Sequence, residues 1–213
     1  MIRGAIAGAV ILLAACTNPG AEPTGIATSV SVLAGNDDTI PRFAAISASP
    51  RPILQVGLLD AGTAGNMLLE ARNGAYEHYL SPNGANIVLR DGMLHSTLGF
   101  GEGLMATDVS EPLFAILRGQ AATTDRIHTY LMGDDRTESR TYRCVLTNRG
   151  PQTLTFLGQS VATRLMSEDC RNAEQAFENL YWVDDTQSRI VQSRQWAGPR
   201  LGAISMRRVG VPQ

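Results

Sequence analysis

The sequence of 213 residues predicts a mainly β protein, an antiparallel β-sandwich or partly open barrel with one or two short helices. From residue 40 onward, short apolar runs alternate with turn-forming residues about every ten positions, which is typical of antiparallel strands. Hydrophobic residues make up 44% of the chain and charged residues 18%, which indicates a folded core. The sequence contains no internal repeat or coiled coil, so one domain is expected.

Residues 1–15 have the pattern of a signal peptide. Arg3 precedes 12 uncharged, mostly apolar residues, which are too few to cross a hydrocarbon core that needs roughly 20 residues. Residues 13–16, Leu-Ala-Ala-Cys, resemble the lipobox of bacterial lipoproteins, in which the cysteine receives a diacylglyceryl thioether and becomes the first mature residue. Thr17, in place of Asp, is typical of release to the outer membrane. The alternative is an ordinary secretory signal followed by an unrelated Cys16.

Residues 16–39 are predicted to be a lipidated tether, because Ala, Gly, Pro, Thr and Ser dominate them. Ile26, Val30 and Leu33 fall on one helical face, which favours a short helix within the tether. Residues 40–213 are predicted to form the β-rich periplasmic domain.

The predicted strands end at turn signals such as Asn73-Gly74 and Asp91-Gly92. They cover residues 53–59, 66–72, 76–80, 87–89, 93–98, 125–132, 137–147, 152–157, 161–166, 179–183, 189–196 and 201–209. A turn is predicted at residues 148–151 and a helix at 170–177. Residues 110–119 predict either a short helix, opened by Glu111-Pro112, or an extended stretch.

The charge pattern excludes several functions. A formal net charge of -2 and a pI near 5.9 argue against nucleic-acid binding. All 18 basic residues are arginines. Catalysis by a lysine Schiff base, a P-loop lysine or a Ser-Lys pair is therefore excluded.

Cys144 and Cys170 are left once Cys16 is assigned to lipid. Two cysteines in an oxidising compartment predict one disulfide, and two free buried thiols are the alternative. A metal site is not expected, because the sequence has no C-x-x-C spacing and its three histidines are isolated from one another.

Three motifs look catalytic at first sight. Residues 99–103 are rich in glycine, like a loop that binds the phosphates of a nucleotide, but they lack the combination of a strand before and a helix after that such a loop needs. We therefore expect a turn that places Leu104 in the core. Ser160 lies in a near miss of the G-x-S-x-G hydrolase motif. The Asp pairs at 37/38, 134/135 and 184/185 fit turns better than glycosidase carboxylates.

The C-terminal third holds both tryptophans of the chain. Tyr181, Trp182 and Trp196 offer aromatic faces that can stack on sugar rings, and Arg194 and Gln195 can bind hydroxyl groups. These five residues are the candidate saccharide- or partner-binding site. The alternative is that the tryptophans fill the core between adjacent strands.

Several segments together resemble the YjbF/GfcB-type lipoprotein family. They are the lipobox, the turns at 83–84 and 91–92 with residues 97–99, the strand of Cys144, and the segments 179–183 and 193–199. The last two, Asn-x-Tyr-Trp-Val and Ser-Arg-Gln-Trp-x-Gly-Pro, are the most specific part of a resemblance that spans residues 40–209.

This resemblance implies an outer-membrane lipoprotein that faces the periplasm, carries fatty acids such as palmitate on Cys16, and serves exopolysaccharide or group 4 capsule production. It implies a mostly antiparallel β-fold and a protein that is not a known enzyme, so the resemblance supplies no catalytic residues, and no cofactor is expected. The expected partners are the membrane, through the lipid anchor, and either polysaccharide or proteins of the export apparatus. Two alternatives stay open: an enzyme that modifies the polysaccharide, and a structural factor for envelope assembly.

Overall fold

The structure, a computed structural model, describes residues 39–101, 103–132, 136–156 and 159–209. Within these ranges it contains two helices and twelve strands. They are α1 (Pro41–Ser47), β1 (Ile53–Leu58), β2 (Thr63–Asn73), β3 (Tyr76–Leu80), β4 (Asn86–Arg90), β5 (Met93–Leu98), β6 (Leu104–Asp108), α2 (Ser110–Arg118), β7 (Ala122–Leu131), β8 (Thr137–Phe156), β9 (Gln159–Arg171), β10 (Ala176–Asp184), β11 (Arg189–Trp196) and β12 (Ala203–Val209). Neither helix is long and apolar enough to cross a membrane.

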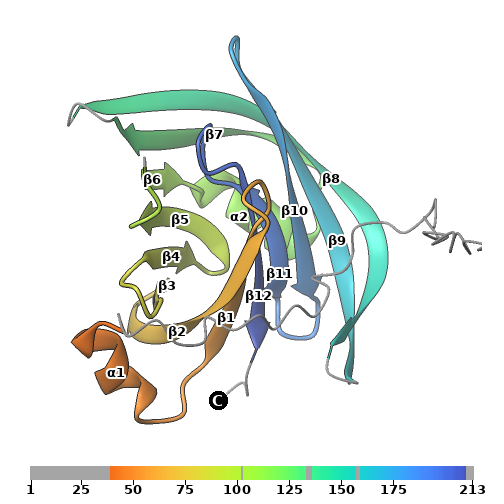
Figure 1. The fold of residues 1–213 in the computed structure, drawn as a ribbon. Coiled ribbons are helices and arrows are strands. Elements are labelled where there is room, and N and C mark those ends of the chain that lie inside the picture. The colour runs from red at the N-terminus through yellow and green to blue at the C-terminus, as the bar shows by residue number, and fades with distance from the viewer. Residues whose placement is uncertain (1–38, 102, 133–135, 157–158, 210–213) are drawn as a thin grey trace, which may run out of the picture.

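The strands form one antiparallel sheet that curls into a nearly closed barrel (Figure 1). Their order is β5-β4-β3-β2-β1-β12-β11-β10-β9-β8-β7-β6. The pairing of β1 with β12, from Ile53↔Val209 to Leu58↔Ile204, joins the two ends of the domain. All other ladders join strands that follow one another in the sequence. The predicted fold class is therefore confirmed, with the barrel as the form adopted.

Side chains close the barrel between β5 and β6, which stand at the two ends of the sheet order. The Thr107 hydroxyl donates to Leu94 O at 2.7 Å, and the Leu104 N–H donates to Thr97 Oγ1 at 3.0 Å. His95 Nδ1 also lies 3.1 Å from Thr107 O. Because Thr97 and Thr107 are buried, their hydroxyls satisfy backbone groups that a strand partner would otherwise bind. We call this contact the β5–β6 seam.

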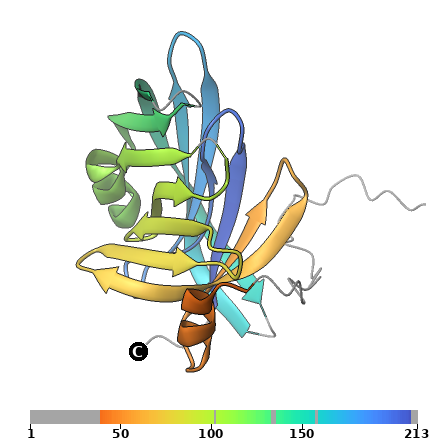
Figure 2. The same ribbon diagram turned by 60° about the vertical axis from the view of Figure 1, so that its left-hand side comes forward.

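The two ends of the barrel differ. Figure 2 shows α2 on one side of the molecule and the β1–β2 hairpin on the other. α2 is amphipathic and buries Leu113 and Ile116 among side chains of the barrel interior. Gly119 ends the helix with a φ of 67°, and Arg164 Nη2 on β9 donates to Leu117 O at 3.1 Å. α2 therefore closes one end of the barrel and leaves the end at the β1–β2 hairpin open.

Two hydrophobic clusters fill the interior. The first cluster lies against β1 to β5 and β12, and its buried members include Leu54, Ile87 and Ile204. The second cluster lies between α2 and strands β8 to β11, and includes Tyr142 and Val183. Alternate, inward-facing residues along each strand supply both clusters, as the period of two in a strand requires.

Gln195 on β11 ties two opposite walls together between the clusters. Its Oε1 accepts a hydrogen bond from Leu94 N–H at 2.9 Å, and its Nε2 donates to Gly92 O at 3.1 Å. Gly92 has a φ of 95°, and a Cβ at this position would lie 2.8 Å from Ile190 Cβ. The β4–β5 turn therefore approaches β11 closely, and the barrel is flattened there.

The turn predicted at residues 148–151 is wrong, because β8 continues through it as one strand. The ladder shifts by one residue between Asn148 and Gly150, which marks a β-bulge. Gly150 has a φ of 90°, and its N–H donates to Asn148 Oδ1 at 2.9 Å. The same residue types that favour a turn here bend a long strand.

The helix predicted at residues 170–177 is also wrong. β9 runs to Arg171 and β10 begins at Ala176. Between them Asn172 Oδ1 accepts the N–H groups of Glu174 and Gln175, so its side chain makes a tight turn where helical residues were expected.

The remaining local predictions gave mixed outcomes. Residues 110–119 form a helix, one of the two alternatives, and Leu104 is fully buried as expected. α1 and β6 were not predicted. The predicted helix at 26–33 and most of the tether lie outside the described residues.

Candidate functional site

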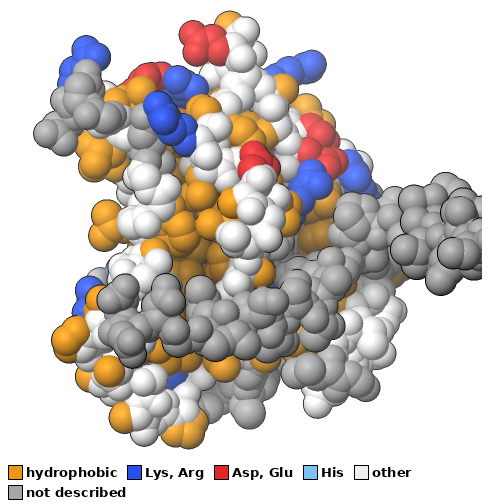
Figure 3. Space-filling model, viewed as in Figure 1, with side chains coloured by type: hydrophobic (Ala, Val, Ile, Leu, Met, Phe, Trp, Pro, Cys, Tyr) orange, Lys and Arg blue, Asp and Glu red, His pale blue; other side chains and the backbone are white. Residues whose placement is uncertain are grey.

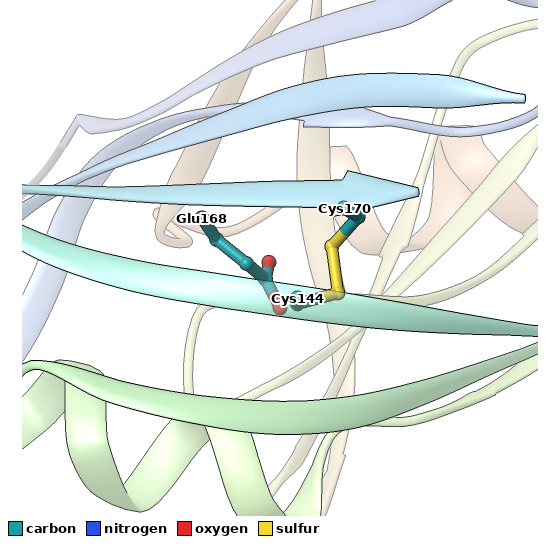
Figure 4. Close-up of side chains that lie close together, drawn as sticks. All are labelled: Cys144, Glu168 and Cys170. Carbon is teal, nitrogen blue, oxygen red and sulfur yellow. A yellow bond between two sulfur atoms is a disulfide. The ribbon is translucent and has the colours of Figure 1, made fainter. Parts of the chain in front are cut away.

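Cys144 on β8 and Cys170 on β9 form a disulfide in the barrel interior (Figure 4). The two residues are direct partners in the antiparallel ladder, and both are buried. A carboxylate oxygen of Glu168 lies within 4.8 Å of both sulfurs. This group resembles a metal-ligand set, but each sulfur is bonded to the other and neither is a thiolate.

Next to the disulfide, five buried polar side chains form what we call the interior polar network. Arg126 Nη1 on β7 donates to Glu168 Oε2 at 2.8 Å and to Tyr181 OH at 3.1 Å. Glu168 Oε2 also accepts from Tyr181 OH at 2.7 Å and from Asn179 Nδ2 at 2.8 Å. Arg126 Nε donates to His128 Nε2 at 2.8 Å. All five residues have 0% of their surface exposed, so the network is sealed from solvent.

Burial and the charges of the network set its protonation. Burial is the largest single influence on the pKa of Arg126 and lowers it, but the Glu168 carboxylate together with Tyr181 and Tyr130 outweighs burial, and the net pKa is raised. Burial, followed by the Arg126 charge, holds the pKa of His128 well below 6.5. Since His128 Nε2 accepts from Arg126, the neutral ring carries its proton on Nδ1, 2.8 Å from Tyr130 OH. Burial also raises the pKa of Tyr181 well above 10.0.

Two atoms of the ion pair have no protein partner, Arg126 Nη2 and Glu168 Oε1. Buried polar atoms of this kind usually bind ordered water. The Arg126–Glu168 pair joins β7 to β9, and the bonds of Glu168 to Asn179 and Tyr181 extend the link to β10. The arrangement can therefore hold three strands in register.

A stack of rings extends from the network. His128 stacks on Phe177 with ring centroids 5.6 Å apart and planes at 22°, and Phe177 stacks on Trp196 at 5.7 Å and 12°. Tyr142 meets the edge of Phe177 at 4.9 Å, and its hydroxyl donates to Gln175 Oε1 at 2.6 Å. Trp196, which is partly exposed, is the outer end of this stack.

The structure separates the five residues that the sequence analysis proposed as a binding site. Tyr181 belongs to the interior polar network, and Gln195 joins β11 to β5; both are fully buried. Trp182 is 7% exposed, and its Nε1 donates to Gln152 Oε1 at 2.6 Å. Tyr181 and Trp182 are consecutive on β10, so their side chains leave opposite faces of the sheet.

Arg194 and Trp196 are the two partly exposed members of this set. Arg194 Nη2 donates to Glu178 Oε2 at 3.0 Å, and Glu178 also pairs with Arg149. The backbone N–H of Trp196 donates to Asn179 Oδ1 at 2.7 Å, which connects Trp196 to the interior polar network. The five residues thus share two neighbouring strands without forming one cluster.

The Gly198-Pro199 pair forms the β11–β12 loop beside Tyr130. Gly198 has a φ of 133°, and a Cβ there would lie 2.8 Å from Tyr130 Cε1. Only glycine fits this close approach without displacing the ring. With the bond from Trp196 N–H to Asn179, this contact gives a structural reason for the Trp-x-Gly-Pro pattern.

Arg126, His128 and Glu168 are not among the functional residues predicted from the sequence. Ile127 and Leu131 fall on one face of the strand predicted at residues 125–132, where apolar side chains would normally face the core, but that face is turned outward, and these two residues are 40% and 39% exposed. The charged face of the same strand fills the interior. The alternation of polar and apolar residues was the available signal. In this strand, however, Arg126 and His128 face the interior, and Ile127 and Leu131 face solvent.

The other candidates lie apart from the network. Ser160 is in the β8–β9 hairpin, where its Oγ is 3.4 Å from Thr155 Oγ1. Asp184 Oδ1 accepts the N–H groups of Thr186 and Gln187, a turn role as expected. The Asp pairs at 37/38 and 134/135 lie outside the described residues.

The fold and site define a disulfide-bonded β-barrel domain with a helix across one end. The family described as group 4 capsule polysaccharide lipoprotein GfcB/YjbF matches residues 26–209. The chain belongs to this family, as its resemblance predicted.

Two proteins of Escherichia coli (K12) are similar to this chain. The uncharacterized lipoprotein GfcB is 27% identical over 135 residues, which cover 60% of this chain and 62% of that protein. The chain thus matches about three fifths of this relative. The crystal structure of the hypothetical lipoprotein YmcC has a TM-score of 0.68 at 22% identity, covering 83% of this chain and 92% of the other, and shares the fold.

Proposed function

We propose that this protein is anchored to the outer membrane by lipid and assists the export or assembly of a capsule-type polysaccharide. In this proposal the β-domain faces the periplasm and binds either the polymer or a protein of the export apparatus. The observation that carries the proposal is the match of residues 26–209 to the group 4 capsule lipoprotein family. The partly exposed Trp196, in the most specific segment of the family resemblance, supports a contact at this position.

Cys16 is the proposed attachment site of the acyl chains. The chain enters the domain where Ile40 N–H donates to Pro82 O at 3.0 Å. The 24 positions from Cys16 to Ile40 span at most about 80 Å when fully extended. Two or three acyl chains make such anchorage stable. A Cys16→Ser variant should lose labelling by radioactive palmitate, and normal labelling would contradict this assignment.

We propose a binding role and not a catalytic one. The Glu168 carboxylate is sealed from solvent against Arg126, and Ser160 lies in a hairpin beside Thr155. These placements support binding, since a catalytic group must reach its substrate. Incubation of the purified protein with the native polymer should leave chain length and substituents unchanged. A change in either would favour the enzyme alternative.

Deletion of the gene should reduce the amount of surface or secreted polysaccharide, and the wild-type gene should restore it. Trp196→Ala should weaken binding in a titration with the native glycan, provided that its thermal transition shows a folded protein. Phe114→Ala is the matched control, because Phe114 is an exposed aromatic residue on α2 at the closed end. Unchanged polymer amount and size in the deletion strain would count against the proposed function.

A further inference from the structure

A pocket of about 200 Å³ lies between the β1–β2 hairpin, the β3–β4 turn and the loop after β5. Val56 and Met67 in its wall belong to the first cluster, and Leu58 and Phe100 pack against that cluster. The floor of the pocket is therefore continuous with the hydrophobic core. Figure 3 shows hydrophobic side chains gathered in a central hollow of the face turned toward the viewer. We call this site the mouth pocket.

The mouth pocket has space because an inward position of β2 lacks a side chain. Gly65 is the direct ladder partner of Val56. Directly paired residues of an antiparallel ladder point to the same face of the sheet. Gly65 therefore faces the interior beside Val56, and a larger residue at this position would fill the pocket.

The lining offers a ligand few polar contacts. None of the residues that line the mouth pocket is charged. Ser81 Oγ lies 3.0 Å from Ala85 O and also contacts Asn83 Oδ1, so both polar side chains are used within the β3–β4 turn. Thr63 and Asn66 are exposed at the rim. A sugar or a charged group would lose its hydrogen bonds to water here, whereas an alkyl chain would not.

The rim carries two exposed leucines and the entry of the N-terminal segment. Leu59, next to the lining residue Leu58, is 47% exposed, and Leu98, next to the lining residue Gly99, is 68% exposed. Ile40, where the chain enters the domain, bonds to the β3–β4 turn that lines the same pocket. The segment that leads from Cys16 therefore joins the domain at this rim.

We propose that the mouth pocket binds an acyl chain of a membrane lipid, with Leu59 and Leu98 in contact with the lipid surface. The uncharged lining selects an alkyl chain, Gly65 provides the space, and the entry of the tether at the rim allows the opening to reach the membrane. This inference rests on the anchoring through Cys16 proposed above, but not on the proposed role in polysaccharide export, because no polymer or export protein takes part in it.

Photolabelling of the lipidated wild-type protein tests the proposal. The vesicles contain phosphatidylethanolamine and phosphatidylglycerol, with a trace of phospholipid that carries a diazirine near the end of one acyl chain. Mass spectrometry should find adducts within residues 56–67 and 98–100. Absence of adducts, or adducts confined to other segments, would overturn the proposal. Adducts that appear only in the Cys16→Ser protein would also overturn it, because the protein's own anchor would then occupy the pocket.

A titration with cis-parinaric acid, a fluorescent fatty acid, tests the same site in solution. The Cys16→Ser protein should bind it saturably, and adding Gly65→Phe should weaken binding by at least about tenfold. Thr141→Phe is the control, because it also introduces phenylalanine into a strand, but on the exposed face of β8. It should leave binding unchanged. Equal affinity of the Gly65→Phe and control proteins would refute the site. If Gly65→Phe does not fold, the photolabelling of the wild type decides.

Discussion

The two halves of the barrel interior are stabilised in different ways. The first cluster consists mainly of aliphatic side chains, such as Leu54 and Ile204, and ends at the mouth pocket. The second half contains the disulfide and the interior polar network, in which Glu168 alone accepts three hydrogen bonds. In an apolar cluster, a truncation removes contacts in proportion to its volume. In the network, it leaves a buried partner without its counter-charge or donor.

The largest effect is expected from breaking the buried ion pair. Glu168→Leu leaves the Arg126 guanidinium buried without its counter-charge and should cost about 3–5 kcal/mol of unfolding free energy. The double variant Arg126→Met/Glu168→Leu removes both charges and should recover part of this loss. Urea denaturation without reductant measures both. A double variant less stable than Glu168→Leu would contradict this account.

Removal of the disulfide should come next. Replacing both Cys144 and Cys170 by alanine opens a loop of 26 positions and should cost about 3–4 kcal/mol in the chain-entropy model. Chemical reduction of the wild type, followed by thermal denaturation, gives an independent value. Equal transitions for oxidised and reduced protein would show that the ladder of β8 and β9 suffices without the covalent bond.

The apolar half should respond to volume alone. Leu54, which is 1% exposed, should lose about 3 kcal/mol on truncation to alanine, through lost burial and the cavity left behind. This variant should keep the pH dependence of the wild type. Chemical denaturation at two pH values checks both expectations, and a changed pH dependence would show that the halves are coupled.

Acid should destabilise the second half through His128. Its pKa in the folded protein lies well below the 6.5 of the unfolded chain, so below pH 6.5 only the unfolded state takes up this proton. Stability is therefore complete above pH 6.5 and should fall by about 1.4 kcal/mol per pH unit below it. His128→Asn should remove this part of the slope. Parallel curves for wild type and variant would rule out His128 as the cause.

The smallest effect is expected on the outer face. Arg143 and Asp125 form an ion pair whose side chains are 63% and 55% exposed. Solvent and salt screen such a pair, so Arg143→Gln should change stability by less than about 1 kcal/mol. Thermal denaturation at low and high salt provides the check. A loss as large as that of Glu168→Leu would remove the distinction between buried and exposed pairs.

The meander could be predicted from the sequence because its signals are local. Asn73-Gly74 and Asp91-Gly92 each join strands that pair directly, and in the structure Asp91 and both glycines have positive φ values. The disulfide could be anticipated from the compartment and the cysteine count. These inferences need only neighbouring residues or the composition of the chain.

The interior polar network could not be predicted, because it joins β7 to two strands, β9 and β10, that lie about 40 positions or more further along the chain. A charged residue in a strand normally indicates the face turned to solvent. The sequence therefore predicts that Arg126 and Glu168 face solvent, whereas both are buried in the interior. The same limit applies to the two tryptophans. Neither Trp182 nor Trp196 carries a local signal that separates an outer face from an inner one.

The pairing of β1 with β12 gives the chain a directional requirement. Ile53 and Val209 are direct partners in this ladder, although they stand at opposite ends of the domain's sequence. A polypeptide that emerges from its amino end can complete the local hairpins as it appears, but the first strand must wait for the last. The domain therefore stays unfinished until its final strand has emerged, and loss of β12 would leave β1 with an open edge.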